Sequence, residues 1–123
     1  MDWKLGKMEA RFAELIWRNA PISSGELVKL CQRELEWKKS TTYTMLRRLC
    51  QRGIFENREG TVVSLLTREE VLAQQSESFL EETFQGSLPQ FLAAFTARKP
   101  LTEEEIRELE ALIRRSSEGR ESR

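Results

Sequence analysis

At 123 residues, the chain is long enough for one domain of ordinary size, or for a compact domain of about 70 residues with a smaller appendage. Its 20 basic and 20 acidic side chains cancel, and it contains no histidine. Without histidine, the usual general base, the Ser-His and Cys-His catalytic pairs and most zinc sites are excluded, and no glycine-rich loop offers a phosphate cradle. We therefore expect no enzyme activity, no metal site and no cofactor.

The charges are divided unevenly along the chain. Residues 1–68 hold 13 Lys and Arg against 8 Asp and Glu, a net charge of +5, whereas residues 69–123 hold 7 against 12, a net charge of −5. This asymmetry indicates that the first part faces a polyanion and that the second does not. The alternative that composition leaves open is solvated charge on two small helical units.

Two features bear on the compartment in which the protein works. No apolar run of signal-peptide length opens the chain, and no 18 apolar residues follow one another. Cys31 and Cys50 fall on apolar positions of predicted helices without CxxC spacing, so we predict small buried hydrophobes and no disulfide. We expect a soluble, cytoplasmic protein with no membrane partner.

Two helices are predicted before residue 36. The first covers residues 6–19 and ends before Pro21. Its buried face is predicted from apolar spacing at Met8, Phe12, Leu15 and Ile16. The second covers residues 24–35 and opens with a capping box, in which Ser23 stands three residues before Glu26.

A third helix is predicted in the stretch KKSTTYTMLRRLCQRG, residues 38–53. At 100° per residue, one side gathers Thr42, Met45, Leu46, Leu49 and Cys50. The opposite side gathers Ser40, Thr44, Arg47, Arg48 and Gln51, with Tyr43 on the flank. Gly53 supplies the left-handed residue that ends such a helix.

The next stretch, IFENREGTVVSLLT, predicts two short strands around Glu59-Gly60. Three helices followed by a hairpin is the order of a winged helix-turn-helix. Such a domain lays its third helix in the DNA major groove, where hydroxyls near the helix start can approach bases. The candidate phosphate contacts are the flanking cations Lys38, Lys39, Arg47, Arg48 and Arg52. A solvated charged face is the alternative for this stretch alone.

Three more helices are predicted after the composition changes at Thr67. Capping-box spacings place their starts near Arg68, Leu88 and Glu103, and the tail, residues 115–123, has no apolar residue and should fray. The large apolar set in this region is Phe79, Leu80, Phe84, Leu88, Phe91, Leu92, Phe95, Ile106, Leu109 and Ile113. So small a unit cannot hide this set alone, so we predict that it forms the interface of a homodimer. Folding back onto the first domain is the alternative.

The order of features resembles the BlaI/MecI/CopY family of bacterial repressors, which control penicillinase, methicillin-resistance and copper genes. The likeness rests on AELIWRNAPISSGELVKLC, WKKSTTYTMLRRLCQRGIF, SFLEETFQGSL and LTEEEIRELEALI. It implies a dimeric winged-helix repressor on an operator with two-fold symmetry. The residues that it implies at the groove are Lys39, Ser40, Thr41, Tyr43 and Thr44, with Arg48 near the DNA backbone.

The chain departs from the family pattern in several places. Lys38-Lys39 stands where the family commonly has Ser-Pro, which removes a good N-cap and adds two cations. The wing is short and aliphatic, with Arg58 and Thr61 as its candidate DNA contacts, and the tail lacks the cysteines of the copper-responsive branch. In the penicillin-responsive branch, cleavage at an Asn-Phe bond inactivates the repressor. The corresponding pair here is Ala94-Phe95, in which Phe95 fits this pattern and Ala94 does not. A regulatory protease is therefore a candidate partner, and the alternative is that Ala94 and Phe95 are packing residues only.

We therefore predict a mainly α fold with a small β-hairpin. Residues 1–67 would form a winged helix that binds a double-stranded DNA operator, and residues 68–123 a three-helix dimerisation region with a frayed tail. The predicted function is a dimeric, sequence-specific transcriptional repressor of a palindromic operator. The alternative is a helical protein-interaction adaptor that uses the winged helix without binding DNA; such an adaptor would more often present apolar anchors on the third helix.

Overall fold

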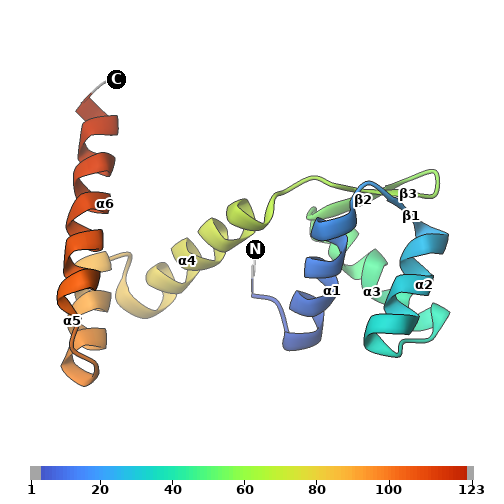
Figure 1. Ribbon diagram of the computed structural model, residues 1–123, viewed down its shortest axis with the longest axis horizontal. Coiled ribbons are helices and arrows are strands. Elements are labelled where there is room, and N and C mark those ends of the chain that lie inside the picture. The colour runs from blue at the N-terminus through green and yellow to red at the C-terminus, as the bar shows by residue number, and fades with distance from the viewer. Residues whose placement is uncertain (1–3, 122–123) are drawn as a thin grey trace. The chain divides into compact units, whose positions relative to one another are not determined.

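The computed structural model describes residues 4–121 (Figure 1). This part of the chain contains six α-helices and three short strands: α1 (Lys7–Asn19), β1 (Ile22–Ser23), α2 (Ser24–Leu35), α3 (Lys39–Gln51), β2 (Phe55–Arg58), β3 (Thr61–Ser64), α4 (Arg68–Phe84), α5 (Leu88–Arg98) and α6 (Glu103–Glu121). The predicted mainly α fold with a β-hairpin is thus confirmed, and each predicted helix begins within one residue of its expected start. Two compact units divide between Phe79 and Leu80, inside α4.

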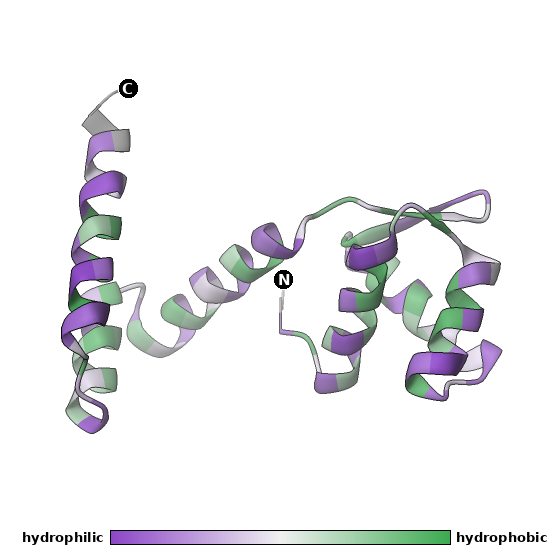
Figure 2. Cartoon of the chain, viewed as in Figure 1, coloured by the Kyte–Doolittle hydropathy of each residue, from purple (hydrophilic) through white to green (hydrophobic). Residues whose placement is uncertain are grey.

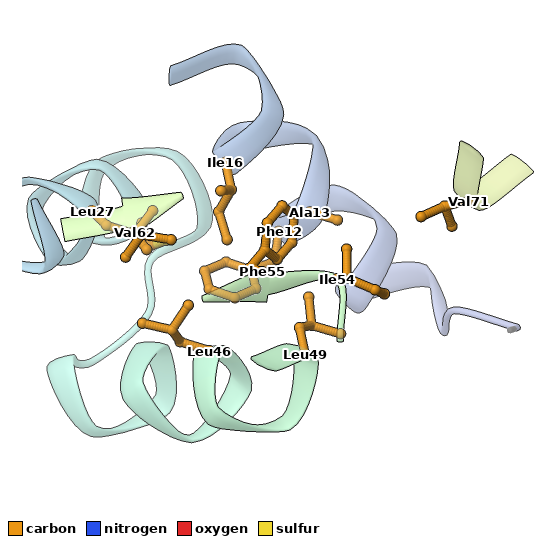
Figure 3. Close-up of a cluster of buried hydrophobic side chains, with 11 residues drawn as sticks. Phe12, Ala13, Ile16, Leu27, Leu46, Leu49, Ile54, Phe55, Val62 and Val71 are labelled. Atoms are coloured by element: carbon orange, nitrogen blue, oxygen red, sulfur yellow. The ribbon is translucent and has the colours of Figure 1, made fainter. Parts of the chain in front are cut away.

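One face of each of the first three helices forms the core of the first unit. Along these helices, hydrophobic and hydrophilic residues alternate around the ribbon, as expected of helices with a single buried face (Figure 2). Figure 3 shows Phe12 and Ile16 from α1, Leu46 and Leu49 from α3, and Phe55 from β2 converging on one cluster. Each such side chain contributes roughly 1.5–3 kcal/mol when fully buried, so this cluster fixes how α3 is held against the rest of the unit.

The wing is a three-stranded antiparallel sheet in the order β1-β3-β2. The hairpin turn is Glu59-Gly60, with φ of 51° and 93°, the pair of positive angles that a two-residue hairpin loop favours. Asn57 Oδ1 accepts a hydrogen bond of 2.9 Å from the Gly60 amide and braces this turn. The predicted hairpin is confirmed, and β1 adds a two-residue strand whose Ile22 pairs with Val62.

A short, well-fixed turn joins α2 to α3. Ser23 caps α2 as predicted, because its Oγ accepts a hydrogen bond of 3.1 Å from the Glu26 amide. At the other end Glu36 adopts the left-handed conformation, and the Trp37 amide donates to the Cys31 carbonyl over 3.3 Å. The Trp37 ring then lies 5.2 Å from that of Phe12, centroid to centroid, so the turn is anchored in the core.

Both cysteines are free thiols, as predicted, with Cys31 buried and Cys50 half-buried. Burial raises the pKa of each thiol above its ordinary value. A raised pKa lowers the fraction of reactive thiolate, which agrees with a packing role.

The second unit is built from the end of α4, α5 and α6. Ser87 Oγ accepts from the Gln90 amide over 3.2 Å at the start of α5, and Thr102 and Glu105 cap α6 reciprocally. Inside the unit the Phe91 ring lies 5.6 Å from that of Phe84. No helix of the described residues is both long enough and apolar enough to cross a membrane.

The tail is helical where the sequence predicts fraying. α6 continues through Glu121, so the structure describes residues 115–121 as helix, and residues 122 and 123 lie outside the described residues. Arg and Glu are good helix formers, and they continue the helix although Gly119 disfavours it by about 1 kcal/mol.

Candidate nucleic-acid interface

The two faces of α3 are separated as the sequence predicts. Thr42, Leu46 and Leu49 are buried against the core. The exposed residues of the outer face are Lys39, Ser40, Thr41, Thr44, Arg47, Arg48 and Gln51. This outer face presents hydroxyls in the first turns and guanidinium groups in the third, which is the arrangement needed to approach bases and phosphates together.

Among residues 4–121, the cations of this face have no acidic ion-pair partner. α3 contains no Asp or Glu, and in the part of the chain that the structure describes Lys38, Lys39 and Arg47 form no ion pair. Elsewhere in the first unit, in contrast, Lys29 lies 3.6 Å from a Glu26 carboxylate oxygen and Arg58 lies 3.2 Å from one of Glu56. Unpaired cations on one side of a helix generate the positive potential that attracts a polyanion.

The start of α3 is open to solvent and carries no side-chain cap. Its N-cap residue is Lys38, which makes no capping hydrogen bond, as the sequence predicts from the missing Ser-Pro pair. The first backbone N–H groups of α3 are therefore available beside two exposed ammonium groups, and such N–H groups bind phosphate favourably.

Tyr43, predicted at the groove, is held partly inside the domain. It is half-buried, and its hydroxyl donates a hydrogen bond of 3.2 Å to Ser24 Oγ on α2. It also lines a surface hollow of about 390 Å³ between α3 and β2, together with Leu46, Arg47, Cys50, Glu56 and Asn57. The tyrosine hydroxyl thus links the two helices of the helix-turn-helix.

Arg52 is placed differently from the other predicted phosphate contacts. Its Nη2 donates a hydrogen bond of 3.0 Å to the Lys4 carbonyl, and its Nη1 lies 3.6 Å from Glu9 Oε2. Only 20% of its side chain is exposed. Arg52 therefore ties the end of α3 to the N-terminal segment and α1, a long-range contact that helix periodicity does not reveal.

The two predicted wing residues flank the hairpin turn. Thr61 is exposed and pairs with Arg58 across the hairpin. The Arg58 side chain is 60% exposed and lies beside the Glu56 carboxylate. Both side chains are therefore accessible to a large ligand that approaches the wing.

The predicted dimer residues divide into exposed and half-buried groups. Those exposed are Phe79, Leu88, Phe95, Ile106 and Ile113, and those half-buried are Leu80, Phe84, Phe91, Leu92 and Leu109. Leu112, which the sequence prediction omitted, is 53% exposed and lines a hollow of about 540 Å³ with Leu88 and Ile113. Its position three residues after Leu109 was the signal that could have found it.

The predicted cleavage pair lies in α5, where Ala94 and Phe95 are both exposed.

Comparison with known proteins agrees with this geometry. The family model described as penicillinase repressor matches residues 5–115, which is nearly the whole described chain. The chain belongs to the penicillinase repressor family. This finding confirms the resemblance to the BlaI/MecI family, and the protein is a transcriptional repressor by family.

Two relatives show how far this sequence has diverged from other members of the penicillinase repressor family. The methicillin resistance regulatory protein MecI of Staphylococcus aureus is 20% identical over 115 residues, which cover 90% of this chain and 94% of MecI. The penicillinase repressor of Bacillus licheniformis is 26% identical over 114 residues, covering 89% of each chain. The similarity therefore extends over both units of the structure.

Proposed function

We propose that this penicillinase repressor family member is a homodimeric repressor that binds a double-stranded DNA operator with two-fold symmetry. The observation that carries the proposal is the outer face of α3, which is exposed, free of acidic residues and lined by cations without ion-pair partners among the described residues. An apolar anchor set, which a protein-docking adaptor would need, is absent from that described face.

The proposed contacts follow from position on α3. Ser40, Thr41 and Thr44 lie in the first two turns and would face base edges. The cations that would meet phosphates are Lys38, Lys39, Arg47 and Arg48, with Arg58 and Thr61 reaching the backbone from the wing. Arg52 would support α3 from behind, because Glu9 and the Lys4 carbonyl already engage its guanidinium.

The second unit supports the proposal of a dimer. Leu88, Leu112 and Ile113 are each more than half exposed, and they line one hollow. A contiguous apolar surface of this kind is costly to leave in water, and a two-fold pair of identical chains is the commonest way to cover it. Two copies of α3 related by a two-fold axis would then match an operator with an inverted repeat.

We further propose that loss of the dimer releases the operator. Joining two half-site readers makes the second binding event intramolecular, which is worth about 10²–10⁴ in affinity. A cut at Ala94-Phe95 would interrupt α5 beside the Phe91 ring, whose centroid lies 6.1 Å from that of Phe95. Derepression would follow without any change to α3. The test is to follow repressor size in cells given a cell-wall antibiotic, where an uncut chain alongside induced target genes would rule out proteolysis as the switch.

The central experiment is selection of bound fragments from random DNA by the purified protein. We expect an inverted repeat, and we expect Arg47→Gln to weaken binding to it. Arg107→Gln is the matched control, because it removes one exposed cation from acid-rich α6 and leaves α3 untouched. Recovery of no enriched sequence, or equal loss in both variants, would favour the adaptor function.

A further inference from the structure

Three side chains fasten the start of α4 to α1, and we call this set, Glu14, Trp17 and Arg68, the α1–α4 junction. Arg68 Nε donates a hydrogen bond of 2.7 Å to Glu14 Oε2, and Arg68 Nη2 donates to Glu14 Oε1. The guanidinium carbon also lies 5.8 Å from the centroid of the Trp17 ring. Arg68 is therefore held by a two-point carboxylate contact and by an aromatic face, which Lys could not reproduce.

Trp17 connects this junction to the wing. Its Nε1 donates a hydrogen bond of 2.9 Å to the Leu66 carbonyl, just before α4 begins. Its ring lies 5.6 Å from that of Phe55 on β2. One turn into α4, Val71 is 1% exposed and belongs to the core of the first unit. The first turn of α4 is thus part of the winged helix and not of a linker.

A surface hollow lies beside the junction, so the polar contacts add to the packing that holds the direction of α4. A hollow of about 190 Å³ lies between α1 and α4, lined by Leu5, Ala10, Glu14, Trp17, Arg68, Val71, Leu72 and Gln75. Close packing would hold a helix without help from side-chain hydrogen bonds. Here the Glu14–Arg68 contact lies at the edge of this surface hollow, and its loss would leave Val71 and the Trp17–Leu66 hydrogen bond to hold the start of α4, with more freedom to tilt.

α4 turns a small tilt into a large displacement. It is a single helix of 17 residues, from Arg68 to Phe84, and it crosses the division between the two units. At about 1.5 Å per residue its length is about 25 Å, so a tilt of about 10° at Arg68 moves the far end by about 4 Å. That displacement is comparable to the rise of one base pair, about 3.4 Å.

We propose that Glu14, Trp17 and Arg68 determine which half-site spacing the repressor accepts, by fixing the angle at which α4 leaves the winged helix. This inference rests on the proposed function, since spacing has a meaning only for a dimer on two half-sites. In this proposal the three junction residues do not contact DNA themselves. Variants at the junction should consequently bind one half-site normally and fail to discriminate between spacings.

The test measures affinity of the full chain for an isolated half-site and for operators whose half-site separation is changed by one and two base pairs. We expect the wild-type protein to prefer one separation by about tenfold or more. Glu14→Gln and Arg68→Gln should keep the half-site affinity and lose most of that preference. Arg68→Lys should fall between, because it keeps the charge and lacks the two-point contact.

Arg18→Gln is the matched control. Arg18 Nε lies 3.4 Å from the same Glu14 carboxylate, yet both residues belong to α1, so this pair does not hold α4. It should leave the spacing preference intact, whereas the exchange Glu14→Arg with Arg68→Glu should restore part of it. Melting curves of each variant check that it is folded, and an unfolded Arg68→Gln would leave Arg68→Lys and Glu14→Gln as the deciding variants.

The outcomes separate this inference from the proposed function. A wild-type spacing profile in folded Glu14→Gln and Arg68→Lys proteins would overturn the role of the junction while leaving DNA binding in place. Loss of half-site affinity together with spacing preference would also overturn it, because the junction would then support α3. Failure of the wild-type protein to bind any half-site would overturn the proposed function itself.

Discussion

The Tyr43 hydroxyl donates a hydrogen bond to Ser24 Oγ over 3.2 Å and so joins α3 to the first residue of α2. Of the residues that the sequence places at the DNA groove, Tyr43 is half-buried, whereas Lys39, Ser40, Thr41 and Thr44 are exposed. We therefore propose that Tyr43 sets the position of α3, whereas the exposed residues face DNA.

The first prediction tests this distinction. Tyr43→Phe and Ser24→Ala each remove the same hydrogen bond, so each should lower the free energy of unfolding by about 0.5–1.5 kcal/mol, and the double variant should cost no more than the larger single effect. Neither should change which bases are preferred. Denaturant titration and binding to operator variants give both readouts. Altered base preference in Tyr43→Phe but not in Ser24→Ala would instead assign the hydroxyl to base reading.

Thr44 and Arg48 should differ in the kind of binding they support. Both are exposed on the outer face of α3. Thr44→Ala should reduce discrimination between operator and random DNA by about 1–3 kcal/mol, whereas Arg48→Ala should weaken binding to all sequences alike. Competition titrations with the two DNAs provide the measurement. An equal loss on both DNAs for Thr44→Ala would remove it from the set of base contacts.

Binding should depend steeply on salt. Four cations per subunit, Lys38, Lys39, Arg47 and Arg48, are exposed at α3, so a dimer would displace about eight counterions. The slope of log affinity against log salt should then be about −7, with roughly a 10⁴-fold loss between about 50 and 200 mM. Lys39→Gln should make the slope shallower by about two for the dimer. A wild-type slope shallower than about −2 would favour the adaptor function.

Assembly should depend on the second unit. A chain ending at Phe79 keeps Val71 in the core and Arg68 on Glu14, so it should be folded and monomeric. A chain ending at Thr67 loses the buried Val71 side chain and should be less stable by about 1.5–3 kcal/mol. Sedimentation and thermal unfolding compare the two with the full chain. A dimeric chain ending at Phe79, or a monomeric full chain at micromolar concentration, would contradict the proposed interface.

Stability should fall in acid partly through Glu14. The hydrogen bond from Arg68, the largest cause, holds the pKa of Glu14 below its ordinary value of 4.5, against an opposing effect of burial. A depressed pKa in the folded state gives stability that is present above about pH 4.5 and is lost as pH falls through the folded value. Glu14→Gln should therefore flatten the decline of the melting temperature below about pH 4.5.

Glu105 offers a comparison from the other unit. Hydrogen bonds from the Thr102 backbone and then from its side chain lower the pKa of Glu105. Glu105→Gln should accordingly affect the acid decline of the second unit and leave that of the first unchanged. A wild-type acid profile in Glu14→Gln would show that the Arg68 contact contributes nothing measurable to folding.

Local signals in the sequence were sufficient to predict the helices and the hairpin. Ser23, Ser87 and Thr102 cap the helices that they were predicted to start, because capping is decided within four residues. Glu59-Gly60 forms the hairpin turn for the same reason. A two-residue hairpin loop requires positive φ at two successive positions, and this requirement depends only on the residues of the turn. The two faces of α3 likewise follow from spacing alone.

Contacts between distant residues were not predictable from these signals. Arg68 and Glu14 are 54 positions apart, and only the packing of α4 on α1 brings them together. Arg52, assigned to phosphate from its charge and place near α3, reaches Lys4 across 48 positions. β1 has two residues, too few to display a strand period. Tertiary structure therefore decides which of several similar cations is free for a ligand.

The continuity of α4 across the division between Phe79 and Leu80 bears on protein engineering. In an α-helix each added residue rotates everything beyond it by about 100° and advances it by about 1.5 Å. A chimera that grafts a foreign dimerising helix after Phe79 must therefore preserve helical phase. An insertion of about seven residues, close to two full turns, would keep that phase, whereas one of about two residues would turn the graft to the opposite side.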